Sequence, residues 1–116
     1  MRICREFYFD AAHSLPDYKG KCKQLHGHTY KLEVIVEGNI GKDGMLMDFN
    51  ELKEIVNSNI LERLDHGDLN EIFDVPTAEN IASWIFRELR NKIPVYSVRL
   101  WEGKDKWVEV CKESEE

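Results

Sequence analysis

The chain has 116 residues and a formal net charge of −6. This length fits one compact domain spanning residues 1–116, and the acidic balance argues against a nucleic-acid-binding protein, because such proteins need a basic excess to neutralise phosphates. With 42% hydrophobic and 33% charged residues, the composition is that of an ordinary folded soluble protein, so we expect its ligand to be a small molecule.

Cysteine usage and hydropathy indicate the compartment. The three cysteines Cys4, Cys22 and Cys111 are odd in number and lack the spacing typical of small disulfide-bonded domains. The N-terminus does not resemble a signal peptide. No apolar run approaches the roughly 18 residues that a membrane span needs. We therefore expect a cytoplasmic protein with no membrane partner.

Two strands are predicted in the first third of the chain. Residues 2–13 alternate, and His13 shares parity with the apolar positions, so an extended strand turns it toward their face. Residues 26–38 alternate in the same way, with His26 and His28 on the apolar side. The pattern predicts that all three histidines face the interior.

Two helices follow the strands. Residues 48–64 carry one apolar stripe and open with Asp48 and Glu51 at capping-box spacing. A second amphipathic helix begins after Thr77, which is placed to cap it, and ends before Pro94.

The C-terminal part predicts a hairpin. Residues 95–102 and 107–112 read as strands, and the turn lies at residues 103–106. The order of two strands, two helices and two strands predicts an α+β fold.

A metal site is the first functional hypothesis. Histidines two apart on a strand project from one face, so His26 and His28 can chelate one ion, and His13 from the neighbouring strand would complete a three-imidazole site. Such a site leaves zinc one open position, as in catalytic centres. The alternative is that these are ordinary core or surface histidines.

Cys22 has three interpretations that the residues alone leave open. It is a small buried hydrophobe, or a fourth zinc ligand that closes a structural site, or a reactive thiolate. Lys19, Lys21 and Lys23 surround it, and nearby cations stabilise a thiolate that acts as base or nucleophile. These lysines are equally explained as a solvated loop.

Two further groups are candidates for chemistry. Asp65 and His66 are adjacent at the end of the first helix, and an Asp–His element suggests proton transfer near neutral pH, unless the two residues only solvate the helix end. Glu102 shares parity with Val98 and Leu100, so it places a carboxylate at the end of an apolar face. A ligand with adjacent N–H groups would satisfy it; otherwise it is an exposed strand end.

Along nearly its whole length the chain resembles the 6-pyruvoyltetrahydropterin synthase / 6-carboxytetrahydropterin synthase family. The motifs that carry the resemblance occur in the order typical of the family: "FDAAH", "CKQLHGH", "MDFNELK", "LDHGDLN", "PTAEN" and the "WEG" that contains Glu102. The resemblance implies the tunnelling fold (T-fold), a four-stranded antiparallel sheet with two helices on one face in the order ββααββ. It also implies a homohexamer, built as a dimer of trimers with active sites between subunits.

The resemblance also implies roles for individual residues. His13, His26 and His28 match the zinc ligands, and Cys22 with Asp65 and His66 match the catalytic triad. Glu102 matches the pterin-anchoring glutamate, while Thr77 and Glu79 match the segment that lines the pterin pocket, where Ala78 replaces a frequent hydroxyl residue.

The gap of three residues between Cys22 and His26 resembles the carboxy branch of the family, which serves queuosine and 7-deazapurine biosynthesis. The activity implied is zinc-dependent conversion of 7,8-dihydroneopterin triphosphate to 6-carboxytetrahydropterin, acetaldehyde and triphosphate, with Lys19, Lys21 and Lys23 near the triphosphate. The alternative within the family is 6-pyruvoyltetrahydropterin synthase, which stops before carbon–carbon cleavage. Rivals from other classes are a structural zinc domain with Cys22 as fourth ligand, and a zinc hydrolase that does not need Cys22.

Overall fold

The computed structural model describes residues 1–15, 20 and 24–113. The centre of the fold is a long antiparallel pair of strands, β1 (Arg2–His13) and β2 (His26–Glu37). The pair stays in register from Arg2 opposite Glu37 to His13 opposite His26. Both predicted strands are confirmed, and their register brings two of the three histidines directly opposite each other.

Two more strands continue the sheet on the other side of β2. β4 (Val95–Glu102) pairs antiparallel with β2, and β5 (Trp107–Cys111) pairs antiparallel with β4, as the predicted hairpin requires. Tyr30 of β2 lies opposite Glu102. The end of β4 is therefore the same end of the sheet at which β1 and β2 carry their histidines.

The prediction of a four-stranded antiparallel sheet misses one short strand. β3 (Gly67–Asp68) pairs parallel with Ala11 and Ala12 of β1, which makes a five-stranded sheet in the order β3-β1-β2-β4-β5. The main-chain N–H of His66 donates to the oxygen of Asp10 at 2.6 Å, so the chain joins the edge of β1 as soon as it leaves the preceding helix. A two-residue strand has no periodicity from which it can be predicted.

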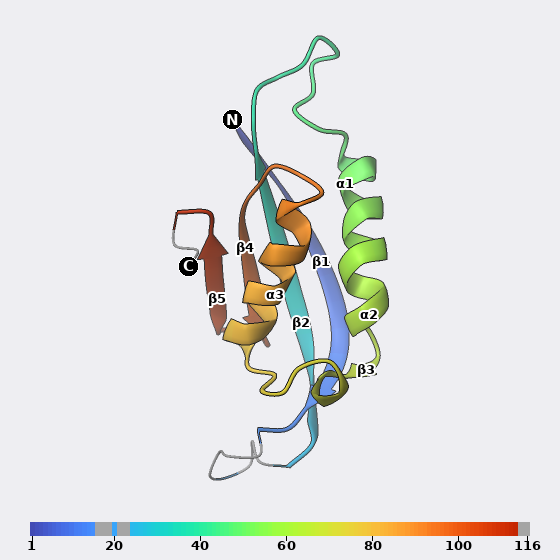
Figure 1. The fold of residues 1–116 in the computed structure, drawn as a ribbon, viewed down its shortest axis with the longest axis vertical. Helices are drawn as coiled ribbons and strands as arrows, with labels where there is room; N and C mark the ends of the chain where they lie inside the picture. The colour runs from blue at the N-terminus through green and yellow to red at the C-terminus, as the bar shows by residue number, and fades with distance from the viewer. Residues whose placement is uncertain (16–19, 21–23, 114–116) are drawn as a thin grey trace.

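The helices lie on one face of the sheet (Figure 1). The first predicted helix is divided into α1 (Phe49–Val56), the π-helical turn η2 (Asn57–Leu61) and α2 (Glu62–Leu64). The Asp48 side chain caps its start by accepting from the N–H of Asn50. Because a π-helical turn needs an extra residue, it rotates everything that follows it relative to an uninterrupted α-helix.

α3 (Ala78–Arg90) begins where the sequence predicts, with Thr77 as its N-cap. The Thr77 hydroxyl oxygen accepts from the N–H of Asn80 at 3.2 Å. A short 3-10 turn, η3 (Leu69–Glu71), precedes it. In Figure 1 the N-terminal end of α3 lies beside the start of β5, close to the histidine end of the sheet.

The core lies between the sheet and the helices. The inner face of the sheet and the apolar stripes of the helices bury the alternate residues that the periodicity predicts, among them Phe7, Phe9, Tyr30, Leu32, Val34, Leu52, Ile60, Ile81, Ile85 and Leu100. His13 ends this apolar row on β1 and is only 1% exposed. A buried imidazole at the end of an apolar face needs partners for both of its nitrogens.

Candidate metal centre

Strand register brings His13, His26 and His28 together on the inner face. His13 lies opposite His26, and His28 lies opposite Ala11, two positions along β1. The ring centroids are 4.7 Å apart for His13 and His26, 5.1 Å for His13 and His28, and 4.7 Å for His26 and His28. The cluster predicted from strand parity is therefore present in the fold.

Main-chain oxygens determine which ring nitrogens face the centre of the cluster. The Nδ1 atom of His13 lies 2.7 Å from the oxygen of Pro76, and Nδ1 of His26 lies 2.7 Å from the oxygen of Gln24. A carbonyl oxygen only accepts, so each Nδ1 carries the proton and donates it. In the neutral imidazoles each Nε2 then presents a lone pair toward the cluster.

These lone pairs fit a bound cation. Nε2 of His13 and Nε2 of His26 are 3.2 Å apart, and two lone pairs at this distance repel unless a positive charge lies between them. Zinc held at about 2.0–2.1 Å by two imidazoles in tetrahedral geometry separates their nitrogens by about 3.4 Å. The ligand nitrogens of the three histidines lie within 4.8 Å of one another, so the cluster can hold a metal ion.

His28 gives a second sign of a missing partner. Its Nε2 atom is buried and has no hydrogen-bond partner among the described residues. Burial lowers the pKa of His28, Glu102 opposes this, and the imidazoles of His13 and His26 lower the pKa further. His28 is thereby kept in the neutral form, which is the form that binds a metal.

Glu102 lies at the edge of the cluster and faces a pocket. Its Oε1 atom is 3.6 Å from Nε2 of His28, too far for a hydrogen bond. Glu102, His13, Thr77 and Glu79 line one pocket of about 350 Å³, together with Ala78 and residues of the β4–β5 turn. His13 of the cluster thus lines the same pocket as all three residues predicted to bind substrate.

Asp65 and His66 form the contact that their adjacency alone could not establish. Nδ1 of His66 is 3.1 Å from Oδ1 of Asp65, and the same carboxylate oxygen accepts from the main-chain N–H of Asp10 at 3.0 Å. His66 has a φ of 60°, a conformation that L-residues other than glycine rarely adopt. Its side chain is 80% exposed. Strand β1 therefore holds a strained, exposed Asp–His element at its edge.

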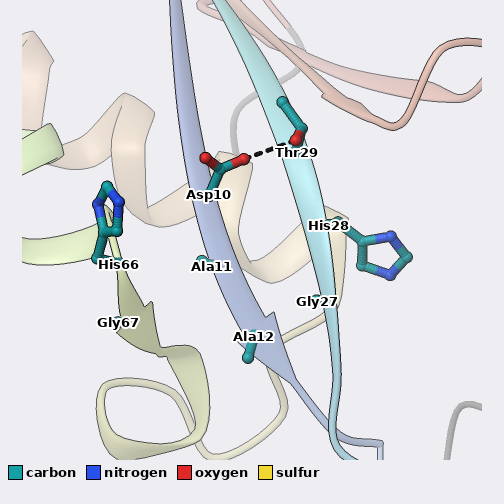
Figure 2. Close-up of a pocket in the computed structure, with 8 residues that line it drawn as sticks. All are labelled: Asp10, Ala11, Ala12, Gly27, His28, Thr29, His66 and Gly67. Carbon is teal, nitrogen blue, oxygen red and sulfur yellow. Dashed lines mark hydrogen bonds between the residues drawn. The ribbon is translucent and has the colours of Figure 1, made fainter.

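The Asp–His element does not face the histidine cluster of its own chain. Figure 2 shows His66 beside β1, while the imidazole of His28 projects on the far side of β2. His66 lines a pocket of about 410 Å³ with Asp10, Thr29 and His28, and the Thr29 hydroxyl donates to Asp10 at 2.6 Å. Although His28 also lines this pocket, its imidazole points away from His66 in Figure 2. One chain therefore holds the two predicted halves of the site apart.

Cys22 and the flanking Lys19, Lys21 and Lys23 lie outside the described residues. The interpretations of Cys22 as a base and as a fourth ligand both remain predictions. Of the other two cysteines, Cys4 is a free thiol.

Sequence reasoning missed several participants in the site. The carbonyl oxygens of Pro76 and Gln24 orient two imidazoles, and main-chain atoms carry no signal in the residue types. Lys106 also lines the pocket of Glu102. The predicted turn at residues 103–106 would place Trp107 across the hairpin from Glu102, whereas in the structure Trp107 pairs with Trp101 and Lys106 lies opposite Glu102.

Comparisons with known proteins agree with this geometry. The model of a family described as 6-pyruvoyl tetrahydropterin synthase matches residues 2–113. The chain is 48% identical over 103 residues to a putative 6-carboxy-5,6,7,8-tetrahydropterin synthase of Archaeoglobus fulgidus, covering 88% of each. It is 44% identical over 113 residues to the dihydroneopterin monophosphate aldolase of Pyrococcus furiosus, covering 94% of this chain and 96% of that protein.

A third relative differs in length. The 6-carboxy-5,6,7,8-tetrahydropterin synthase of Haemophilus influenzae is 39% identical over 129 positions, covering 87% of this chain and 92% of that protein. This alignment is longer than the chain's 116 residues, so that relative carries segments that this chain lacks. The Pyrococcus furiosus protein matches with little difference in length.

The fold has solved counterparts. The structure of 6-pyruvoyl tetrahydropterin synthase from Caenorhabditis elegans superposes with a TM-score of 0.87 at 28% identity, covering 96% of this chain and 94% of that chain. The predicted α+β tunnelling fold is thereby confirmed. Within the part of the chain that the structure describes, no helix has the length and apolar character needed to cross a membrane. With a family model that matches almost every residue and relatives at 48% and 44% identity, the chain belongs to the 6-pyruvoyl tetrahydropterin synthase family.

Proposed function

We propose that this chain is a zinc-dependent 6-carboxy-5,6,7,8-tetrahydropterin synthase, a lyase that converts 7,8-dihydroneopterin triphosphate and water to 6-carboxytetrahydropterin, acetaldehyde and triphosphate. The observation that carries the proposal is the three-imidazole cluster, one member of which, His13, lines the pocket that also contains Glu102, Thr77 and Glu79. Two relatives with this activity in their names, at 48% and 39% identity, support it. The product would serve queuosine or another 7-deazapurine pathway.

His13, His26 and His28 would hold the zinc ion and leave its fourth position for substrate. When bound, zinc would supply Lewis-acid chemistry, polarising the hydroxyl oxygens of the substrate side chain. The main-chain oxygens of Pro76 and Gln24 keep the two donating imidazoles in the ligand tautomer.

Glu102 would orient the pterin ring. An ionised carboxylate accepts two parallel hydrogen bonds, which matches the adjacent 2-amino and N3–H groups of a pterin. Because Glu102 lies beside His28, a ring anchored there would direct its side chain along the pocket toward the histidine cluster. Thr77 and Glu79, at the start of α3, would line the ring on the other wall.

Proton transfer would require groups from two chains. The Cys22 thiolate would remove a proton from the side chain of the substrate, and His66, oriented by Asp65, would return one. Since His66 lies away from the cluster of its own chain, it would serve the pocket of a neighbouring subunit. We therefore include a homohexamer with intersubunit active sites in the proposal.

The test is product analysis. Purified protein loaded with zinc is incubated with 7,8-dihydroneopterin triphosphate, and the products are identified by mass spectrometry. Acetaldehyde with 6-carboxytetrahydropterin supports the proposal, whereas a pyruvoylpterin without acetaldehyde assigns the chain to the 6-pyruvoyltetrahydropterin synthase branch. No turnover in the presence of zinc would refute both.

A second candidate is an aldolase acting on dihydroneopterin monophosphate. The relative from Pyrococcus furiosus with that name matches 94% of this chain with little difference in length. A retro-aldol cleavage of the side chain would yield a hydroxymethylpterin and a phosphorylated aldehyde, with the phosphate ester intact. Incubating the same protein with the monophosphate distinguishes the two candidates, since only the aldolase would release an aldehyde that still carries phosphate.

A further inference from the structure

Lys106 faces the pocket from directly opposite Glu102. The main-chain N–H of Glu102 donates to the oxygen of Lys106 at 2.9 Å, one step beyond the Trp101–Trp107 pair, so the two residues oppose each other across the β4–β5 turn. Side chains in such a pair lie on the same face with their Cβ atoms about 5 Å apart. Glu102 and Lys106 accordingly line the same pocket as His13.

The ammonium group of Lys106 is available to a ligand in that pocket. In the part of the chain that the structure describes, it forms no ion pair, although Glu102 lies across the turn. A carboxylate and a cation thus flank one wall of the pocket without neutralising each other by contact.

This pair matches one edge of a pterin. A 2-amino-4-oxo ring presents two donors, the amino group and N3–H, followed by one acceptor, the carbonyl oxygen at C4. The Glu102 carboxylate can accept from both donors, and a neighbouring ammonium can donate to the oxygen. A 4-amino ring would instead turn an N–H donor toward Lys106, where it would find no acceptor.

We propose that Lys106 binds the C4 oxygen of the pterin ring and, with Glu102, makes the pocket selective for 2-amino-4-oxo rings. The inference deepens the proposed function and rests on it, because it takes a pterin as the ligand. It assigns Lys106 a role in ring specificity that is separate from proton transfer and from metal binding.

The test compares two ligands. Fluorescence titration of the zinc-loaded protein gives the Kd for 6-hydroxymethylpterin and for 2,4-diamino-6-hydroxymethylpteridine. The diamino ring also differs at N3, the position that faces Glu102, and this difference affects the wild type and the Lys106 variants alike. The contribution of Lys106 is therefore measured by how far its substitution changes the ratio of the two Kd values. We expect Lys106→Met to reduce the preference for the 4-oxo ring by about 10-fold or more, and Lys106→Arg to retain most of it.

Lys104 provides the matched control. It is an exposed lysine of the same turn, but it lines a pocket with Tyr8, Lys31 and Trp101, which is distinct from the pocket of Glu102. Lys104→Met should leave the Kd ratio unchanged. Zinc content and the thermal midpoint are measured for each variant, and Lys106→Gln replaces Lys106→Met if the latter does not fold.

The outcomes distinguish a failure of the proposed function from a failure of the inference about Lys106. A wild-type protein that binds neither pteridine would overturn the proposed function and this inference together. A second outcome is that the wild type binds the pterin while Lys106→Met has the same ratio of Kd values as Lys104→Met, or binds both ligands more weakly by the same factor. In either case Lys106 does not distinguish the groups at C4, and only this inference is wrong.

Discussion

The histidine cluster and the Asp65–His66 element lie at the same end of the sheet but differ in how they are built. The cluster lies on the inner face, and main-chain oxygens orient two of its imidazoles. The Asp–His element is exposed at the edge of β1, with His66 in a strained conformation. The first arrangement preorganises three imidazoles that can hold a metal ion, whereas the second leaves one imidazole exposed at a sheet edge.

Removing a metal ligand should have the largest effect. We expect His28→Ala to lower zinc affinity by more than about 100-fold and to abolish turnover, because one of three ligands is lost. Metal content after dialysis and a zinc titration measure this. His66→Ala is the control and should retain zinc. Equal zinc loss in both variants would mean that zinc binding is not confined to the histidine cluster.

Zinc should also stabilise the fold. At a free zinc concentration 100 times its Kd, ligand binding adds about 2.7 kcal/mol to the free energy of unfolding. Urea denaturation with and without a chelator measures the difference. The stabilisation should vanish in His28→Ala and persist in His66→Ala, and any other pattern would place the metal elsewhere.

Replacing Cys22 should reduce turnover without releasing zinc. We expect Cys22→Ala to lower kcat by about 100- to 10,000-fold, as expected for loss of a proton-transfer group, with the zinc content of the wild type. Turnover is followed by product formation from 7,8-dihydroneopterin triphosphate. Loss of zinc together with folding would instead support the rival structural site with Cys22 as fourth ligand.

Mixing two inactive variants tests whether one active site combines Cys22 of one chain with His66 of a neighbouring chain. Cys22→Ala and His66→Ala should each be inactive alone, but hexamers assembled from equal amounts of both should recover about a quarter of wild-type activity, since a random pairing combines an intact Cys22 with a neighbour's intact His66 at one interface in four. Co-expression followed by an activity assay measures this. No recovery from folded, mixed hexamers would mean that both groups act within one chain.

Relieving the strain at His66 should have the smallest effect. At a φ of 60°, glycine avoids the steric cost of a side chain, so we expect His66→Gly to raise the free energy of unfolding by up to about 1 kcal/mol while activity is lost. Urea denaturation of zinc-loaded protein measures it. His66→Ala keeps the Cβ atom and should give no gain; a gain of equal size would show that strain is not the cause.

Much of the site could be predicted because strand parity is local. Alternation along β1 and β2 placed His13, His26 and His28 on the buried face, and alternation along β4 placed Glu102 at the end of its apolar row. The side chain of a residue two positions along a strand returns to the same face whatever the rest of the fold does. The caps at Asp48 and Thr77 were equally predictable, since each bonds within three residues of itself.

Other features depended on contacts between distant segments. The strand β3, the outward direction of His66 and its strained backbone follow from where the chain leaving α2 meets the edge of β1, more than fifty residues away in sequence. The π-helical turn η2 changes the direction in which the chain leaves α2. The spacing of apolar residues along the helix does not indicate that one turn contains an extra residue.

Residue types and short-range periodicity therefore account for the histidine cluster, the helix starts and the family, because those properties are encoded within a few neighbouring positions. Three-dimensional packing accounts for the rest: the carbonyl oxygens that orient the imidazoles, the Lys106 that faces Glu102, and the separation of His66 from the cluster. These arise where strands and loops from different parts of the chain meet, and main-chain atoms offer no residue-type signal in advance.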